Sequence, residues 1–236
     1  MGQLSLDATR RDLLRTVGAG AALSGLGGTV AAQTGGETAQ RGRTGRRVHE
    51  VRTLISTPPT GDRPADFFYQ PTGLRVRPGD VLRFVFETPD HNVVSYHPAF
   101  GMYRRVPTGV GPFTSPLLGW RPETIPDDQV QPPSETGGGQ AAPDTWLLSL
   151  DVPGVYDVLC SPHEVYGMAM RVVVGDQTSA PFETADPSAL PEPRVGPAGL
   201  ARVTLTDPAL APRTIVDRGR VRWQDLQAVQ STPSGG

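Results

Sequence analysis

The nine residues from Cys160 to Met168, CSPHEVYGM, constrain the fold and function of this chain more than any other stretch. They hold the only cysteine of the protein, one of its four histidines and one of its four methionines. A thiolate, an imidazole and a thioether are soft metal ligands, and a trigonal His2Cys site with a weak axial Met is typical of blue copper. The stretch therefore predicts a copper site that contains Cys160, His163 and Met168 and needs a second histidine.

Two histidines compete for the remaining position. His91 stands in the sequence DHNVV directly after a strongly apolar, strand-like run, whereas His97 lies six residues further on. The position at the end of a strand and the following Asn-Val favour His91, and His97 is then a surface residue or a neighbour of the site. His49 is far from the motif, and we expect it to be structural.

The other assignments also have simpler alternatives. A lone cysteine in an exported chain is buried and inert, paired between molecules, or bound to metal. An inert cysteine does not explain a histidine three residues later. Met168 competes with Met170 and Met102, and Gly167 permits a tight loop at Met168. Met170 is explained completely by core packing.

The rest of the chain has the pattern of an all-β protein. The 236 residues include 28 Gly and 25 Pro, and only 19% are charged, which suits a loop-rich β fold. Short apolar runs separated by turns predict strands at 48–55, 67–76, 81–87, 93–96, 146–152, 155–160 and 169–174. Seven short strands without a helical period predict an antiparallel β-sandwich.

Strand alternation orients the side chains of the predicted sheet. Cys160 shares a face with Tyr156 and Val158, so we expect it to point inward, with Asp157 on the opposite face. In the last strand Met170 belongs to the inward row, and Arg171 is expected to point outward.

These features resemble the plastocyanin/pseudoazurin branch of the cupredoxins, the type 1 blue copper proteins, over about residues 47–176. The resemblance rests on Cys-Ser-Pro-His-x4-Met before a Val-rich strand, and on His-Asn-Val after a Gly-Asp-Val-x-Arg-Phe strand. It implies an eight-strand Greek-key sandwich that binds one copper ion through His91, Cys160, His163 and Met168. It also implies that Asn92 ties the two ligand loops together.

Three further segments are predicted around a domain at 47–176. Residues 1–32 resemble a twin-arginine signal peptide, with TRRDLLR at 9–15, a weakly apolar run and a small-residue cleavage site. Residues 33–46 have the composition of a disordered linker. Residues 177–236 form a Pro-rich C-terminal extension, in which Asp207-Pro208 predicts a helix start.

The long stretch between the ligands departs from the small plastocyanin-like domains. Residues 97–143 predict an elaborated surface loop that either packs on the sandwich or contacts a partner. Its candidates for apolar contact are Phe100, Met102, Tyr103, Phe113 and Trp120.

Together the sequence predicts an exported electron carrier of the periplasm, the outer face of the cell membrane or the extracellular space, and not an enzyme. We expect redox proteins as partners, a monomer, and peripheral membrane contact through the linker or an uncleaved signal. A net charge of −2 does not favour nucleic acid as a partner. The alternative is an extracytoplasmic copper carrier without an electron-transport role. Four histidines are too few for a multicopper oxidase, and one cysteine is too few for a binuclear copper site.

Overall fold

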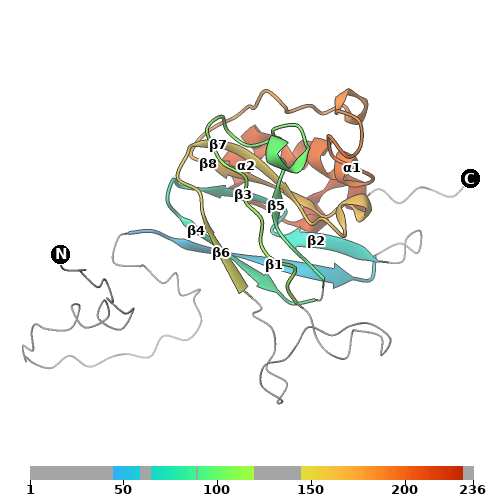
Figure 1. The fold of residues 1–236 in the computed structure, drawn as a ribbon, viewed down its shortest axis with the longest axis horizontal. Coiled ribbons are helices and arrows are strands. Elements are labelled where there is room, and N and C mark those ends of the chain that lie inside the picture. The colour runs from blue at the N-terminus through green and yellow to red at the C-terminus, as the bar shows by residue number, and fades with distance from the viewer. Residues whose placement is uncertain (1–44, 59–64, 89, 120–144, 231–236) are drawn as a thin grey trace, which may run out of the picture. The chain divides into compact units, whose positions relative to one another are not determined.

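Two β-sheets pack face to face in this protein (Figure 1). The structure is a computed structural model that describes residues 45–58, 65–88, 90–119 and 145–230. The first sheet has the order β2-β1-β4-β6 and consists of β2 (Asp66–Gln70), β1 (Val48–Ser56), β4 (Val81–Phe86) and β6 (Thr145–Ser149). The second has the order β5-β7-β8-β3-β9 and consists of β5 (Val94–Ser95), β7 (Gly154–Leu159), β8 (Ala169–Val174), β3 (Gly73–Val76) and β9 (Arg220–Val221).

The sandwich core lies between the sheets, where alternate residues of each strand meet. Leu82, Phe84 and Phe86 on β4 are buried, while Arg83 between them is exposed. Cys160, directly after β7, is fully buried in the same cluster. The predicted all-β sandwich is confirmed, and the described part of residues 47–176 contains the eight strands β1 to β8.

Two details of the predicted sheet pairing are wrong. β1 pairs with β4 in parallel, and β3 pairs with β8 in parallel, so the sandwich is mixed rather than antiparallel. The single strand expected over 67–76 is two strands, because the chain leaves the first sheet at Pro71 and enters the second at Gly73. The alternation of apolar and polar residues within a strand does not show which strand lies beside it or in which direction that strand runs.

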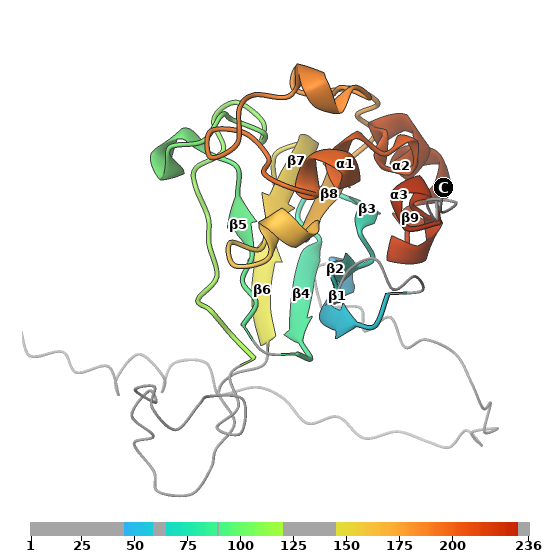
Figure 2. The same ribbon diagram turned by 90° about the vertical axis from the view of Figure 1, so that its right-hand side faces the viewer.

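The C-terminal extension covers the outer face of the second sheet (Figures 1 and 2). It contains α1 (Ala201–Thr206), α2 (Pro212–Arg218) and α3 (Gln227–Gln230) and contributes β9 to the sheet edge. Leu210, Ile215 and Trp223 are buried in one cluster with Val173 of β8. The extension is therefore packed against the sandwich.

The packing of the C-terminal extension buries Arg171, which was expected to point outward. The residue lies on the face opposite Met170, as predicted, but only 1% of its surface is exposed. Its guanidinium donates to Asp157 Oδ1 at 2.7 Å and to the carbonyls of Leu205 and Leu210 in the extension. Arg105 donates to the same carboxylate. This face of the sheet therefore holds a buried Arg–Asp–Arg group instead of side chains exposed to solvent.

The helix start predicted at Asp207 is present, but the helix is short. The Asp207 carboxylate accepts from Ala209 N at 2.9 Å and caps a three-residue 3-10 helix, Pro208–Leu210. The longer α2 begins afterwards at Pro212.

Several predicted segments lie outside the described residues. They include the signal peptide at 1–32, almost all of the linker at 33–46, and residues 120–144 with Trp120. Within the described part of the chain, no helix combines the length and hydrophobicity needed to cross a bilayer.

Candidate metal centre

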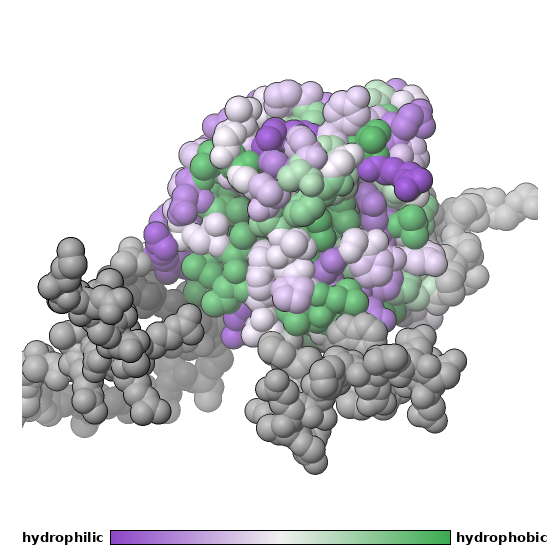
Figure 3. Space-filling model, in the orientation of Figure 1, coloured by the Kyte–Doolittle hydropathy of each residue, from purple (hydrophilic) through white to green (hydrophobic). Residues whose placement is uncertain are grey.

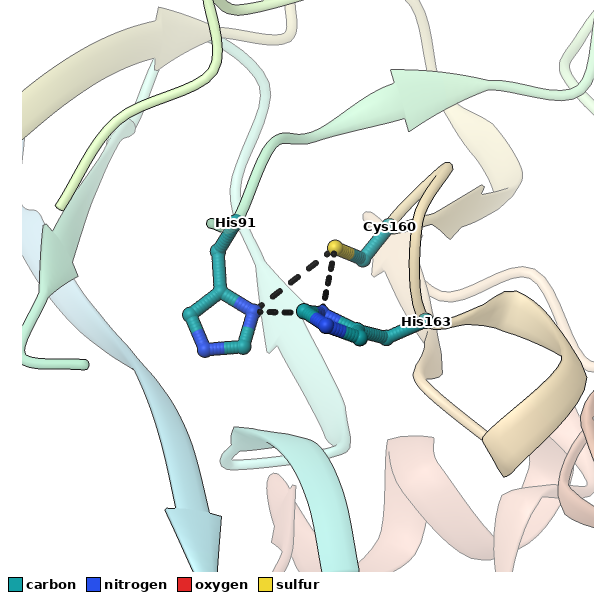
Figure 4. Close-up of side chains that lie close together, drawn as sticks. All are labelled: His91, Cys160 and His163. Atoms are coloured by element: carbon teal, nitrogen blue, oxygen red, sulfur yellow. Dashed lines mark hydrogen bonds between the residues drawn. The ribbon is translucent and has the colours of Figure 1, made fainter. Parts of the chain in front are cut away.

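Three donor atoms converge at one end of the sandwich (Figure 4). Cys160 Sγ lies 3.7 Å from His91 Nδ1 and 3.5 Å from His163 Nδ1, and the two nitrogens are 3.2 Å apart. The centre of this triangle lies roughly 2.0 Å from all three atoms, close to the ~2.0–2.3 Å of metal–nitrogen and metal–sulfur bonds in proteins. The structure thus brings together three of the four residues proposed as ligands, and their side chains point at a common centre.

His91 is held from two sides. It lies between β4 and β5 and forms a two-way backbone bridge with Leu118, in which Leu118 N donates to His91 O at 2.8 Å. The Thr88 hydroxyl lies 2.7 Å from His91 Nε2, which leaves Nδ1 directed at the other donors. A partner on the second ring nitrogen is the usual way of orienting a metal-binding histidine.

Cys160 and His163 belong to one tight segment, the ligand loop, residues 160–168. His163 N donates to Cys160 O at 3.0 Å, and Cys160 N donates to Met168 O at 3.0 Å. The Cys160 sulfur also accepts from Asn92 N at 3.5 Å. These backbone bonds hold the cysteine and the histidine of the loop together.

The His163 ring packs against two aromatic side chains, Phe67 and Tyr166. Phe67 of β2 stacks on it with ring centroids 4.2 Å apart. Tyr166 stacks on Phe67 at 5.1 Å, and its tilted ring lies 6.4 Å from the His163 ring. His163 is only partly buried, in contrast to His91. One ligand of the site therefore reaches the surface and the others do not.

Met168 completes the candidate set at the end of the ligand loop. It is fully buried in the same cluster as Cys160. Its amide donates to His163 O at 3.1 Å, and Gly167 before it has a positive φ of 102°. Such a φ favours glycine, as expected from the tight loop.

Burial controls the protonation of the donors. It raises the pKa of the Cys160 thiol to about 12 and lowers the pKa of the His91 imidazole to about 3. It also lowers the pKa of His163. At neutral pH both imidazoles are therefore uncharged and able to bind a metal, whereas the thiol still carries its proton.

The competing residues have other roles. His97 caps the 3-10 turn Pro98–Phe100, where its Nδ1 accepts from Ala99 N at 3.1 Å. His49 lies 2.9 Å from the Asp80 carboxylate, which agrees with a structural role. Met170 is buried on β8, and Met102 packs against a separate cluster.

The structure adds two residues that sequence reasoning missed. Thr88 could have been noticed as a short polar residue just before His91. Phe67 had no such signal, because it lies on a strand far from the motif and reaches His163 only in the folded protein.

The loop between the ligands packs on the sandwich as far as it is described. Val106 and Leu118 are buried in the sandwich core, and Ser115 exchanges hydrogen bonds with Val93. Of the two roles left open by the sequence, packing is present at Val106 and Leu118, whereas the candidates Phe100 and Tyr103 are exposed.

Comparison with known proteins identifies the family. The sequence model of copper binding proteins of the plastocyanin/azurin family matches residues 60–175, which include His91, Cys160, His163 and Met168. The chain belongs to the cupredoxins. A candidate pseudoazurin of Rhizobium leguminosarum bv. viciae is 28% identical over 108 residues, 46% of this chain and 51% of its own. The chain thus spans about half the length of that relative.

Solved pseudoazurins are also similar to this cupredoxin. The Methylobacterium extorquens AM1 protein has 19% identity and a TM-score of 0.37, over 72% of this chain and 92% of its own. The Hyphomicrobium denitrificans protein has 22% identity and a TM-score of 0.37, over 67% and 92%.

The cofactor of this family is copper, and the donors present fit it. Two neutral imidazole nitrogens and one thiol face each other in a mostly buried site, with a thioether in the same loop. Imidazole, thiolate and thioether are the donor types of blue copper sites.

Proposed function

We propose that this cupredoxin carries single electrons between redox proteins as a type 1 blue copper protein, and that it is not an enzyme. The observation that carries the proposal is the convergence of His91 Nδ1, Cys160 Sγ and His163 Nδ1. These three residues would hold the copper ion, and Met168 would be a fourth, weaker ligand.

Bound copper would supply the chemistry, since it can take up and release one electron. The chain's own contribution is to keep the donors nearly fixed while the charge changes. The bridge between His91 and Leu118, the bond from Asn92 N to Cys160 Sγ and the stacking of Phe67 on His163 all restrict donor movement. Restricted movement favours fast electron transfer because few groups must rearrange.

Electron entry is proposed at the exposed edge of His163. Apolar side chains surround this part of the ligand loop, and Val165 and Tyr166 are 50% and 46% exposed. In the extension, Leu200 and Val203 are 43% and 40% exposed, and the Leu200 amide donates to Val165 O at 3.0 Å. Apolar residues are exposed in several areas of the face in Figure 3. An apolar surface beside a partly exposed ligand supports close, short-lived docking of a redox protein.

An absorption spectrum tests the copper site directly. Adding cupric ion to the folded protein is expected to produce an intense visible band from thiolate-to-copper charge transfer. Cys160→Ser is expected to abolish the band. A protein that binds copper without this band contradicts the electron-carrier proposal.

The alternative of a copper carrier makes a different prediction. A carrier releases its metal readily, so a chelator is expected to remove copper within seconds. The complete burial of His91 and Cys160 instead supports slow exchange. The rate of copper loss to an excess of chelator separates the two functions.

A substitution pair tests the docking surface. Val165→Glu is expected to slow electron exchange with a redox partner and to leave the visible spectrum unchanged. Leu147→Glu on β6 is the control, because Leu147 is 62% exposed but lies on the other sheet. Equal rates for both variants would place docking elsewhere.

We also propose export by the twin-arginine route to the periplasm, the outer face of the cell membrane or the extracellular space. The support is the sequence alone, with TRRDLLR at residues 9–15 and the apolar run after it. Replacing Arg10 and Arg11 by lysine is expected to leave the protein in the cytoplasm. Unchanged cell fractionation of this variant would exclude that route.

A further inference from the structure

The C-terminal extension touches the ligand loop through a short segment, residues 198–204, which we call the brace. Four residues stand between His163 and Met168, and the brace bonds to three of them. Ala198 N donates to Glu164 Oε1 at 3.1 Å, and Leu200 N donates to Val165 O at 3.0 Å. The Thr204 hydroxyl donates to Gly167 O at 3.0 Å.

The backbone of the brace packs directly on the backbone of the loop at Gly199. A Cβ atom added there would lie 2.6 Å from Val165 Cα and closer still to the Val165 carbonyl oxygen. Gly199 also has a positive φ of 52°. Any larger residue must therefore move the brace away from the loop.

Thr204 acts on the peptide group that precedes Met168. The Thr204 side chain is 98% buried, and the carbonyl that it bonds belongs to the Gly167–Met168 peptide. A Cβ atom added at Gly167 would lie within 3.5 Å of Thr204, Leu200 and Trp223, so the extension packs closely around this residue. The orientation of this peptide determines where the Met168 side chain begins.

We propose that the brace is a positioning element for Met168 and thereby sets its interaction with copper, with Thr204 and Gly199 as the positioning residues. The proposal rests on the proposed function of the site. It concerns residues beyond the stretch 60–175 that matches the family, so it is a property of this chain's extension. The buried sheet face beneath α2 explains why the extension folds here, but does not require bonds to the ligand loop.

The first test removes one hydroxyl from the full-length protein. Thr204→Val keeps the side-chain shape and loses the bond to Gly167 O. In the copper-loaded protein we expect a shift of the reduction potential and a changed ratio of the visible bands. Because the effect runs through Met168, we expect it to be largely absent when Thr204→Val is made in a Met168→Leu background. An unchanged potential, or equal shifts in both backgrounds, overturns the proposal.

A second readout needs no copper. In the metal-free protein, the amides of Gly167 and Met168 are expected to exchange hydrogen about fivefold faster in Thr204→Val, in line with the loss of one hydrogen bond. Unchanged hydrogen exchange at these amides overturns the proposed role of the brace, even if the copper-loaded protein shows the blue band. If the wild-type protein lacks the blue band, the proposed function fails, and the exchange experiment still reports on the brace.

A glycine pair provides the matched control. Gly199→Ala and Gly219→Ala both place alanine at a positive φ, 52° and 75°, but an added Cβ at Gly219 has nothing within 4 Å. Only Gly199→Ala is expected to alter the visible spectrum and the reduction potential. Equal effects of the two variants would overturn the proposal. If Gly199→Ala does not fold, the comparison of Thr204→Val in the wild-type and Met168→Leu backgrounds decides whether the proposal holds.

Discussion

Asn92 and Ser161 join the two loops that carry the proposed ligands. Asn92 Nδ2 donates to Ser161 Oγ and Ser161 N donates to Asn92 Oδ1, both at 2.7 Å. One residue follows His91 and the other follows Cys160, so the pair holds the ligands of two distant segments in register. The sequence resemblance implied this link, and the structure shows it.

Loss of the Asn92 side chain is expected to weaken metal binding. Removing a residue that orients ligands typically costs 10–100-fold in metal affinity, and we expect a decrease of about this size in Asn92→Ala. Copper competition titrations against a chelator measure it. Asn92→Asp keeps the acceptor for Ser161 N, so its copper affinity should lie between those of the wild type and Asn92→Ala. Full affinity in Asn92→Ala would contradict the role of this link.

The two methionines of the motif should respond differently to the same substitution. Met168→Leu is expected to keep copper bound but shift the reduction potential, because the thioether would be a weak ligand of the ion. Met170→Leu on β8 is a volume-conserving core change, which usually costs less than about 1.5 kcal/mol of unfolding free energy. Voltammetry of both variants compares them. A large potential shift in Met170→Leu instead would show that the assignment of Met168 as the thioether ligand is wrong.

Copper binding should release a proton. Burial raises the pKa of the Cys160 thiol to about 12, so the thiol is protonated in the metal-free protein at neutral pH. Cupric ion binds the thiolate, and about one proton must leave, so the apparent affinity should rise about tenfold per pH unit between about pH 6 and 9. Calorimetric titration in two buffers measures the released proton. A pH-independent affinity would mean that the thiol is already ionised.

Removing the carboxylate of Asp157 should destabilise the fold strongly. The residue is fully buried between Arg105 and Arg171, and Asp157→Asn leaves both cations without their partner. Breaking such a group costs about 3–5 kcal/mol of unfolding free energy. The control is Glu50→Gln, which removes an exposed ion pair with Arg83 and should cost less than about 1 kcal/mol. Urea denaturation compares the two variants.

The pH dependence of stability should follow the same group. The two arginines hold the pKa of Asp157 below its ordinary value, despite burial. A lowered folded-state pKa gives stability that is complete above the unfolded value of about 3.9 and is lost as the pH falls through the folded pKa. In Asp157→Asn this component of acid unfolding should disappear. Identical acid transitions in both proteins would show that other groups control it.

The sequence by itself determined the chemistry of the site and much of the sheet pattern. The types, order and spacing of Cys160, His163 and Met168 are local, and so is the alternation that directs Cys160 into the core. A strand end followed by His-Asn-Val selected His91 over His97. Each of these features depends on neighbouring residues, which is why a linear pattern contains them.

Only the tertiary structure decided which distant segments pair with each strand and pack on each face of the sheets. Arg171 was placed on the correct face, but the extension that buries this face is 34 or more residues away at Leu205 and Leu210. The parallel pairing of β3 with β8 and the stacking of Phe67 on His163 join segments nearly 100 residues apart. Alternation shows which residues share a face, whereas pairing and cover depend on long-range contacts that form only when the whole chain folds.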